Sequence, residues 1–173
     1  MVTPEVTVTD AASLASAIST YTTIGIGSSE ALQQLATIVN SGTSCVGKTF
    51  VLTTDLDLSS ICAAQTDGEG YGGWIAIGNS SSEGFRGSFN GNGHTITGLY
   101  INRQDTDYQG LFGFAGDRAY GGIIKNLGII DADVTGGECT GILAGNGRII
   151  SNCYATGSVT GGNCTGGLVG ITY

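Results

Sequence analysis

The second half of the chain repeats one glycine-punctuated phrase three times, and this repetition constrains the fold more than any other feature. The phrases are centred on Leu111, Leu143 and Leu168. The last two are each preceded by a Cys-Thr-Gly triplet, at residues 139–141 and 164–166. Self-similarity at a near-fixed period indicates a repeat protein whose units stack on one another.

Apolar residues also recur in each copy, so the register between copies can be predicted. Ile96, Leu99 and Ile101 are matched by three apolar residues 28 positions later, and those by three more a further 26 positions on. A period of this length is too long for a hairpin and suits one coil of several short strands. Each inward side chain that is stacked in this way contributes roughly 1.5–3 kcal/mol. The predicted columns are Ile96-Ile124-Ile150, Leu99-Leu127-Cys153, Ile101-Ile129-Ala155 and Leu111-Leu143-Leu168.

These columns predict one all-β domain, a β-solenoid of parallel coils over residues 48–173. Many of the 31 glycines of the chain would supply the tight and positive-φ corners between strands. Helical spacing between Asp10 and Gly42 predicts short amphipathic helices in residues 1–47, which we expect to cap the solenoid. Alternation of apolar residues over Phe50–Leu58 predicts one half-buried strand.

Composition excludes several classes of partner. The formal net charge is −8, and the six basic residues are scattered, which argues against binding to nucleic acid or to an anionic membrane. No apolar run reaches the roughly 18–20 residues of a membrane helix, so we expect no membrane insertion. Five cysteines among few charges favour an oxidising, extracellular setting. Since the first residues lack the layout of a secretion signal, we expect that such a signal was cleaved or lies outside the given sequence.

Two cysteines are expected to form a bridge between coils. Cys139 and Cys164 occupy equivalent positions in adjacent coils, so stacking places their Cα atoms near 4.8 Å, within the range that a disulfide tolerates. Two stacked free thiols are the alternative.

The remaining cysteines give a second expected pair and one single thiol. Cys45 and Cys62 flank the strand predicted at 50–58, and a bridge between them would contribute on the order of 3 kcal/mol. Cys153 lies in the predicted column of Leu127, where we expect a buried free thiol.

Several segments resemble the GLUG-motif repeat proteins, which are named after a Gly-Leu-apolar-Gly phrase. The likeness covers roughly residues 28–173, although Ile142 stands where the phrase has glycine. The resemblance implies a right-handed parallel β-helix in bacterial or archaeal secreted and cell-surface proteins, with repeats that are not themselves catalysts. The matching segments are residues 40–42, 50–58, 74–78, 85–96, 124–127, 151–157 and 167–170.

No residues form a recognisable catalytic constellation. His94 has no nucleophile or second ligand beside it, and we expect it to be structural. Four pairs of carboxylates offer oxygens to Ca²⁺, but a solvated outer face explains them better; Asp67 and Glu69, in a glycine-rich loop, are the least unfavourable pair. A polysaccharide lyase would need a basic residue near such a pair, and Arg103 beside Asp105 and Asp107 is the nearest candidate. The pairs are Asp55/Asp57, Asp67/Glu69, Asp105/Asp107 and Asp131/Asp133.

The sequence therefore favours a non-enzymatic, extracellular structural or adhesive module, without cofactor, of a cell-surface or secreted protein. The chain stops directly after a repeat phrase, so the last coil is expected to expose strand edges. Further repeats of a parent protein would cover those edges. Alternatively, a second copy would do so by head-to-tail stacking or by adding the strand at Val2–Val8, which would build a filament. A carbohydrate-binding or polysaccharide-cleaving β-helix is the third reading, and surface glycans or host and cell-surface proteins would be the partners.

Overall fold

A computed structural model describes residues 1–43, 45–116 and 121–172. The described chain is mostly β-structure, with three helices placed before residue 65. The helices are α1 (Ala11–Thr20), α2 (Ser29–Asn40) and α3 (Ser59–Ala64). The strands are β1 (Val6–Val8), β2 (Thr23–Ile26), β3 (Thr49–Leu52), β4 (Leu56–Asp57), β5 (Gly72–Gly73), β6 (Ser88–Asn90), β7 (Thr95–Thr97), β8 (Tyr100–Asn102), β9 (Phe112–Ala115), β10 (Ile123–Lys125), β11 (Gly128–Thr135), β12 (Ala144–Gly147), β13 (Ile149–Ser151), β14 (Tyr154–Thr160) and β15 (Val169–Ile171).

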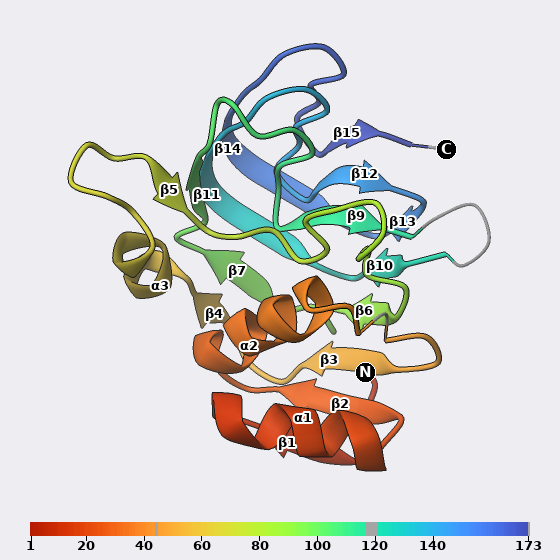
Figure 1. Cartoon of the computed structure of the whole chain (residues 1–173). Coiled ribbons are helices and arrows are strands. Elements are labelled where there is room, and N and C mark those ends of the chain that lie inside the picture. Colours follow the sequence, from red (N-terminus) through yellow and green to blue (C-terminus); the bar gives the residue numbers. More distant parts are fainter. Residues whose placement is uncertain (44, 117–120, 173) are drawn as a thin grey trace.

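The strands form three sheets, and nearly all of their pairings are parallel (Figure 1). Sheet A has the order β1-β2-β3-β6-β10-β13 and runs along the whole molecule. Sheet B contains β4, β7, β11, β8 and β5, with β14 on β11; only β5 is antiparallel to its neighbour. Sheet C has the order β15-β12-β9. From β6 onward the chain visits A, B and C in turn, three times, and one such circuit is called a pass below.

In-register pairing builds continuous apolar columns. In sheet A, each strand contributes one residue to a single column, and from Ile24 to Ile124 these residues are fully buried. Shorter columns run through sheet B and sheet C. The sheet A column is Val6-Ile24-Phe50-Phe89-Ile124-Ile150; sheet B has Leu56-Ile96-Ile129-Ala155 and Ile101-Val134-Val159; sheet C has Phe112-Ala144-Val169.

Aromatic side chains join the sheets in the centre of the core. The Phe112 ring of sheet C lies 5.4 Å from both the Phe85 ring and the Phe89 ring, the latter from sheet A. Phe85 also lies 6.0 Å from Phe50. The buried Trp74 donates from Nε1 to the Leu111 carbonyl at 3.0 Å, which satisfies its polar atom inside the core. One contiguous core therefore extends through the passes and beneath the helices.

The first two helices connect parallel strands of sheet A instead of covering one end as a cap. Helix α1 connects β1 to β2, and α2 connects β2 to β3. The side chains of Asp10 and Ser28 accept hydrogen bonds from backbone amides in the first turns, as N-cap residues do. Apolar faces of both helices are buried in the core. Residues 1–47 therefore contribute two strands to the stack: β1, within the strand expected at Val2–Val8, and β2, which sequence patterning missed.

The alternating segment Phe50–Leu58 forms two strands in different sheets and not one. Strand β3 lies in sheet A and β4 in sheet B, and residues 53–55 form the corner between them. The four alternating apolar side chains, Phe50, Leu52, Leu56 and Leu58, are nevertheless all buried. Alternation of apolar residues by itself cannot show where one strand ends, when the corner that follows leaves the inward and outward positions in the same order.

In sheets A and B the register of the first repeat differs from the one expected, whereas in sheet C Phe112 pairs with Ala144, which sets Leu111 beside Leu143 as predicted. Ile96 pairs with Ile129 and not with Ile124, which stacks on Phe89 instead. The physical reason is the longer corner between β6 and β7, which spans residues 91–94 where later passes use two residues. Gly91 permits this corner, since a Cβ there would lie 2.4 Å from the Asn126 carbonyl oxygen.

Between the second and third passes the expected register agrees with the pairing. Ile124 pairs with Ile150, and Ile129 with Ala155. The Leu127 carbonyl accepts a hydrogen bond from the Tyr154 amide, which places Leu127 next to Cys153. Leu99, by contrast, accepts from Asp133 and is not in that column.

Replacing Leu127 with aspartate should abolish cooperative folding, because the side chain is 1% exposed and a carboxylate there would be desolvated without a partner. Asp133→Asn is the matched control: Asp133 is exposed, and an asparagine oxygen can still accept the Ser158 hydroxyl hydrogen bond. We expect that change to stay within about 0.5 kcal/mol. Thermal unfolding followed by circular dichroism compares them, and equal melting temperatures would contradict the assigned core.

Candidate functional site

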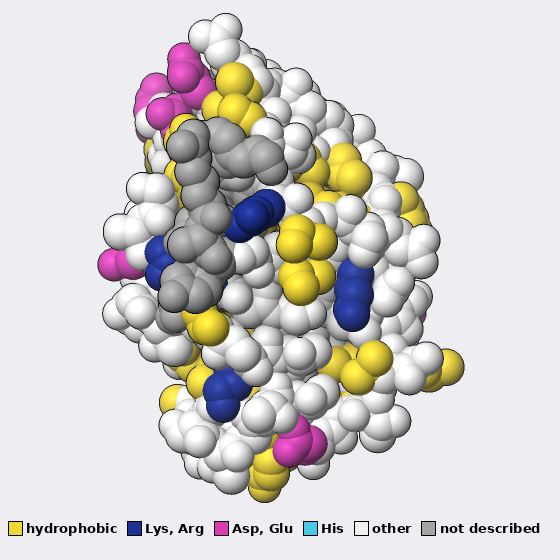
Figure 2. Space-filling view, turned by 90° about the vertical axis from the view of Figure 1, so that its right-hand side faces the viewer, with side chains coloured by type: hydrophobic (Ala, Val, Ile, Leu, Met, Phe, Trp, Pro, Cys, Tyr) yellow, Lys and Arg dark blue, Asp and Glu magenta, His cyan; other side chains and the backbone are white. Residues whose placement is uncertain are grey.

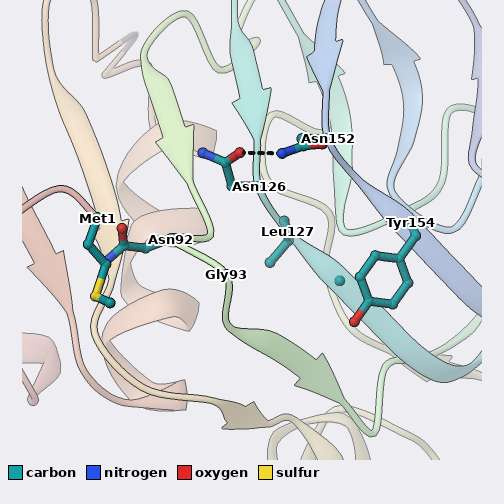
Figure 3. A pocket seen from close by; sticks show the side chains of 8 residues that line it. Met1, Asn92, Gly93, Asn126, Leu127, Asn152 and Tyr154 are labelled. Atoms are coloured by element: carbon teal, nitrogen blue, oxygen red, sulfur yellow. Dashed lines mark hydrogen bonds between the residues drawn. The ribbon is translucent and has the colours of Figure 1, made fainter.

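A groove of about 490 Å³ lies at the corner where sheet A passes into sheet B (Figure 3). Figure 3 shows Met1 and Asn92 on one side of it and Tyr154 on the other, with Asn126 and Asn152 along one edge. Its lining residues come from three successive corners and from the amino terminus: Met1, Asn92, Gly93, Asn126, Leu127, Gly128, Asn152 and Tyr154.

A ladder of asparagines forms one edge of this groove. Asn126 donates from Nδ2 to Asn90 Oδ1 at 2.9 Å, and Asn152 donates to Asn126 Oδ1 at 3.1 Å. Asn126 and Asn152 have φ values of 54° and 56°, in the left-handed region that asparagine tolerates better than most residues. The ladder therefore stabilises the corners and leaves Asn152 Oδ1 as its spare acceptor among the described residues.

Tyr154 provides an aromatic surface on the opposite side. Its side chain is 53% exposed, and its register partner in the preceding pass is Gly128. The ring lies over that glycine, where a Cβ would come within 2.5 Å of it. The Tyr154 hydroxyl has no hydrogen-bond partner in the described part of the chain. Sequence reasoning missed this groove, because its residues are brought together only by stacking of the corners.

The predicted calcium candidates stabilise a turn. Asp67 Oδ1 accepts from the Glu69 amide at 3.0 Å and from the Tyr71 amide at 2.8 Å. A second concavity of about 490 Å³ includes Asp67 together with Asp131 and Asp133. Within residues 1–43, 45–116 and 121–172, no group of three or more histidine, cysteine or acidic side chains is placed to hold a metal ion.

The other polar candidates also bind the backbone of the protein itself. The Nδ1 atom of His94 lies 3.2 Å from Asp55 Oδ1, which also accepts from the Thr95 amide at 2.9 Å. Arg103 donates to the Gly73 carbonyl at 3.1 Å, and Asp107 accepts from the Glu138 amide at 2.8 Å. The contacts of Arg103 and Asp107 therefore fix loops, and a pairing suited to a lyase is not assembled from them.

All five cysteines are free thiols, so neither predicted disulfide is present. For Cys45 and Cys62 the reason is their different surroundings. The Cys45 thiol donates to the Thr43 carbonyl, whereas Cys62 lies on α3 next to the backbone of Trp74 and Tyr100. Burial raises the pKa of the Cys45 thiol to about 11, which keeps it protonated.

The other three thiols belong to the last two passes. Cys139 and Cys164 are reduced neighbours at equivalent corners, close enough for Cys164 to raise the pKa of the Cys139 thiol. Cys153 is only partly buried, and its thiol donates to the Ser151 carbonyl at 3.3 Å.

The last pass is only half covered. Strands β13, β14 and β15 each have a single strand partner in the described structure. Residues that continue the buried columns become partly exposed there, among them Ile150, Val159 and Val169. Figure 2 shows a mainly uncharged face, with a few basic side chains spread over it and acidic side chains gathered at its upper left edge. None of the helices in the described ranges is long and apolar enough to span a membrane.

Two curated proteins are similar to parts of the chain. Halomucin of Haloquadratum walsbyi is 39% identical over 145 residues, which is 83% of this chain but 2% of halomucin. A protein named "Putative Gly-rich membrane protein" of Evansella cellulosilytica is 40% identical over 89 residues, or 51% of this chain and 9% of that protein. No protein-family model matches, and no solved structure is significantly similar. The chain thus resembles small segments of much longer proteins, whose names point to a surface or membrane-associated setting.

Stability should fall in acid because three exposed carboxylates have lowered pKa values. Hydrogen bonds from the Thr22 hydroxyl lower that of Glu5, the Thr95 amide lowers that of Asp55, and the Ser59 hydroxyl lowers that of Asp57. A lowered native pKa means that the stabilisation is complete above the ordinary values of 3.8 for Asp and 4.5 for Glu, and is lost as the pH falls through the native values.

Urea midpoints measured from pH 6 to pH 2 should therefore decrease below about pH 4. Asp57→Asn should flatten this decrease, because asparagine can accept the same hydrogen bonds without titrating. Asp105→Asn is the control, since Asp105 has no hydrogen-bond partner among the described residues. Identical pH profiles for the two variants would contradict the assignment.

Proposed function

We propose that the chain is a non-enzymatic structural or adhesive module of an extracellular cell-surface or secreted protein. Its passes are the coils of a right-handed parallel β-helix, and the uncovered side of the last pass is where further coils of a longer parent protein stack. The uncovered edges of β13, β14 and β15 are the observation that carries this proposal.

The apolar columns support stacking of a further coil. Ile150, Val159 and Val169 continue buried columns, so a coil placed on them would bury their remaining exposed surface. Unpaired strand edges are also liable to irregular association, which another coil would prevent. Because the similar segments make up 2% and 9% of the two relatives, a parent with many more repeats is a natural setting.

The non-enzymatic part of the proposal is supported by how polar side chains are used. Asp55, Asp67 and Arg103 are engaged with nearby backbone groups, so little capacity remains for proton transfer between them. A rigid, weakly charged repeat is suited to spacing or presenting other parts of a surface protein.

A chain extended after residue 172 by a second copy of residues 148–172 tests the proposal. Amide hydrogen exchange of β14 should slow at least about tenfold, because the added coil pairs with an edge that is open in the original chain. The control extension carries Asp at the copied positions of Ile150, Val159 and Leu168, and should leave exchange unchanged. Equal exchange in both extended chains would contradict stacking.

The filament alternative predicts a different behaviour of the unextended chain. Fibres in electron micrographs would favour head-to-tail stacking of copies, whereas discrete particles favour a module continued within one parent chain. Strand addition by residues 2–8 is less favoured than sequence suggests: β1 already pairs with β2, and the Val2 amide donates to Asn92 Oδ1 at 2.8 Å.

The groove at Tyr154 favours a second candidate function, the binding of neutral saccharides. A half-exposed aromatic ring faces uncharged amide groups across a groove of about 490 Å³, and no charged side chain lines it. A flat ring can cover the C–H face of a sugar while the spare oxygen of Asn152 accepts from a hydroxyl group. This would give an adhesive module its glycan partner.

Calorimetric titration with cellohexaose and chitohexaose tests the second function. At least one should bind, and Tyr154→Ala should weaken that binding about tenfold or more. Tyr71→Ala is the matched control, because Tyr71 is 38% exposed but lies outside the groove. Absence of binding by both probes at about 10 mM, or equal losses in the two variants, would refute it.

A further inference from the structure

Cys139 and Cys164 occupy the same corner in successive passes. The Cys139 amide donates to the Asn163 carbonyl at 2.7 Å, and one pass earlier the Tyr108 amide donates in the same way to Glu138. All three corner residues have left-handed backbones, with φ of 56° at Tyr108, 54° at Cys139 and 60° at Cys164. The two thiols therefore project from matching backbone positions.

Backbone and side-chain contacts near the two cysteines hold their corners in equivalent positions. Gly141 and Gly166 form a parallel bridge two residues beyond the cysteines. Each corner has the same internal hydrogen bond, from Thr140 to Gly137 and from Thr165 to Gly162. Adjacent parallel strands lie about 4.8 Å apart, within the Cα separation of roughly 4.4–6.8 Å that disulfides span.

We propose that Cys139 and Cys164 are an oxidation site that closes into an intramolecular disulfide when the chain meets a low-molecular-weight disulfide such as oxidised glutathione. The bond would hold the last pass, with its uncovered strand edges, to the pass before it. The ring that it closes contains β12, β13 and β14.

The exposures of the two thiols set the order of the reaction. Cys164 is exposed whereas Cys139 is 5% exposed, so the oxidant reaches Cys164 first. The Cys164 thiolate attacks the oxidant, forms a mixed disulfide and releases one reduced glutathione. Cys139 then loses its proton to solvent, attacks the Cys164 sulfur and releases the second glutathione. Two thiols are thereby oxidised and one disulfide of the oxidant is reduced.

The second step is the slower one. Burial, and then the hydrogen bond with Cys164, raise the pKa of the Cys139 thiol to about 11. Glu138 raises it further, while a hydrogen bond from Tyr108 lowers it. Burial is the first of these causes and persists in the mixed disulfide, so Cys139 stays mainly protonated near neutral pH and the mixed disulfide should accumulate before the ring closes.

Mass spectrometry of the folded chain after incubation with oxidised glutathione tests the site. The intact mass should fall by two hydrogen atoms after passing through a glutathione adduct. Once free thiols are alkylated, trypsin cleaves after Lys125 and Arg148 and separates residues 126–148, with Cys139, from residues 149–173, with Cys153 and Cys164. The two peptides should appear disulfide-linked.

Matched variants separate the alternatives. Cys153→Ser should keep the linked peptides and Cys164→Ser should lose them. The closed form should melt about 5–10 °C above the reduced form, a difference absent in Cys164→Ser. A glutathione adduct that never resolves, a disulfide between two chains, or a link that uses Cys153 would each overturn the proposal. None of these readouts depends on further coils or on glycan binding.

Discussion

Parallel, in-register hydrogen bonding between successive passes is the constraint on which the rest of the structure depends. It fixes which residue lies above which, and so converts scattered apolar residues into columns such as the one from Val6 to Ile150. No pass can bury its inward side chains alone, because each is only one strand deep. Stability is therefore a property of the stack, and it is lowest at the last pass, where the columns become partly exposed.

The corners between sheets also stack on one another in register. Equivalent corners repeat the same left-handed backbone, with asparagine at residues 126 and 152 and cysteine at residues 139 and 164. Such backbones are costly for most side chains, so the residues there make compensating contacts with the next corner. The asparagine ladder and the thiol pair are two consequences of one rule: stacking places identical positions side by side.

Side chains that make hydrogen bonds within the structure differ from those that remain available to contact other molecules. Carboxylates such as Asp55 and Asp67 accept hydrogen bonds from nearby backbone amides, and these bonds stabilise the loops. Tyr154 lies at the open side of the groove, and Cys164 is exposed at the outer corner. The proposed oxidation site thus lies in the last two passes, and Tyr154 of the proposed saccharide groove lies in the last one, whereas the helices all lie in the segment before β6.

The sequence by itself determined that the chain is a mostly β repeat protein, and its period gave the register of the last two passes, because those passes have nearly equal length. Val134 and Val159, for example, are 25 residues apart and pair directly. The tertiary structure alone decided the first register in sheets A and B, since the longer corner at residues 91–94 shifts the pairing of Ile96 to Ile129. It also decided that residues 1–47 contribute strands to sheet A: the pattern at Val2–Val8 predicted a strand, but only the fold shows that its partner is β2 of the same chain. The groove at Tyr154 likewise exists only through stacking, since residues from the amino terminus and three corners meet there at distances in sequence that no local pattern records.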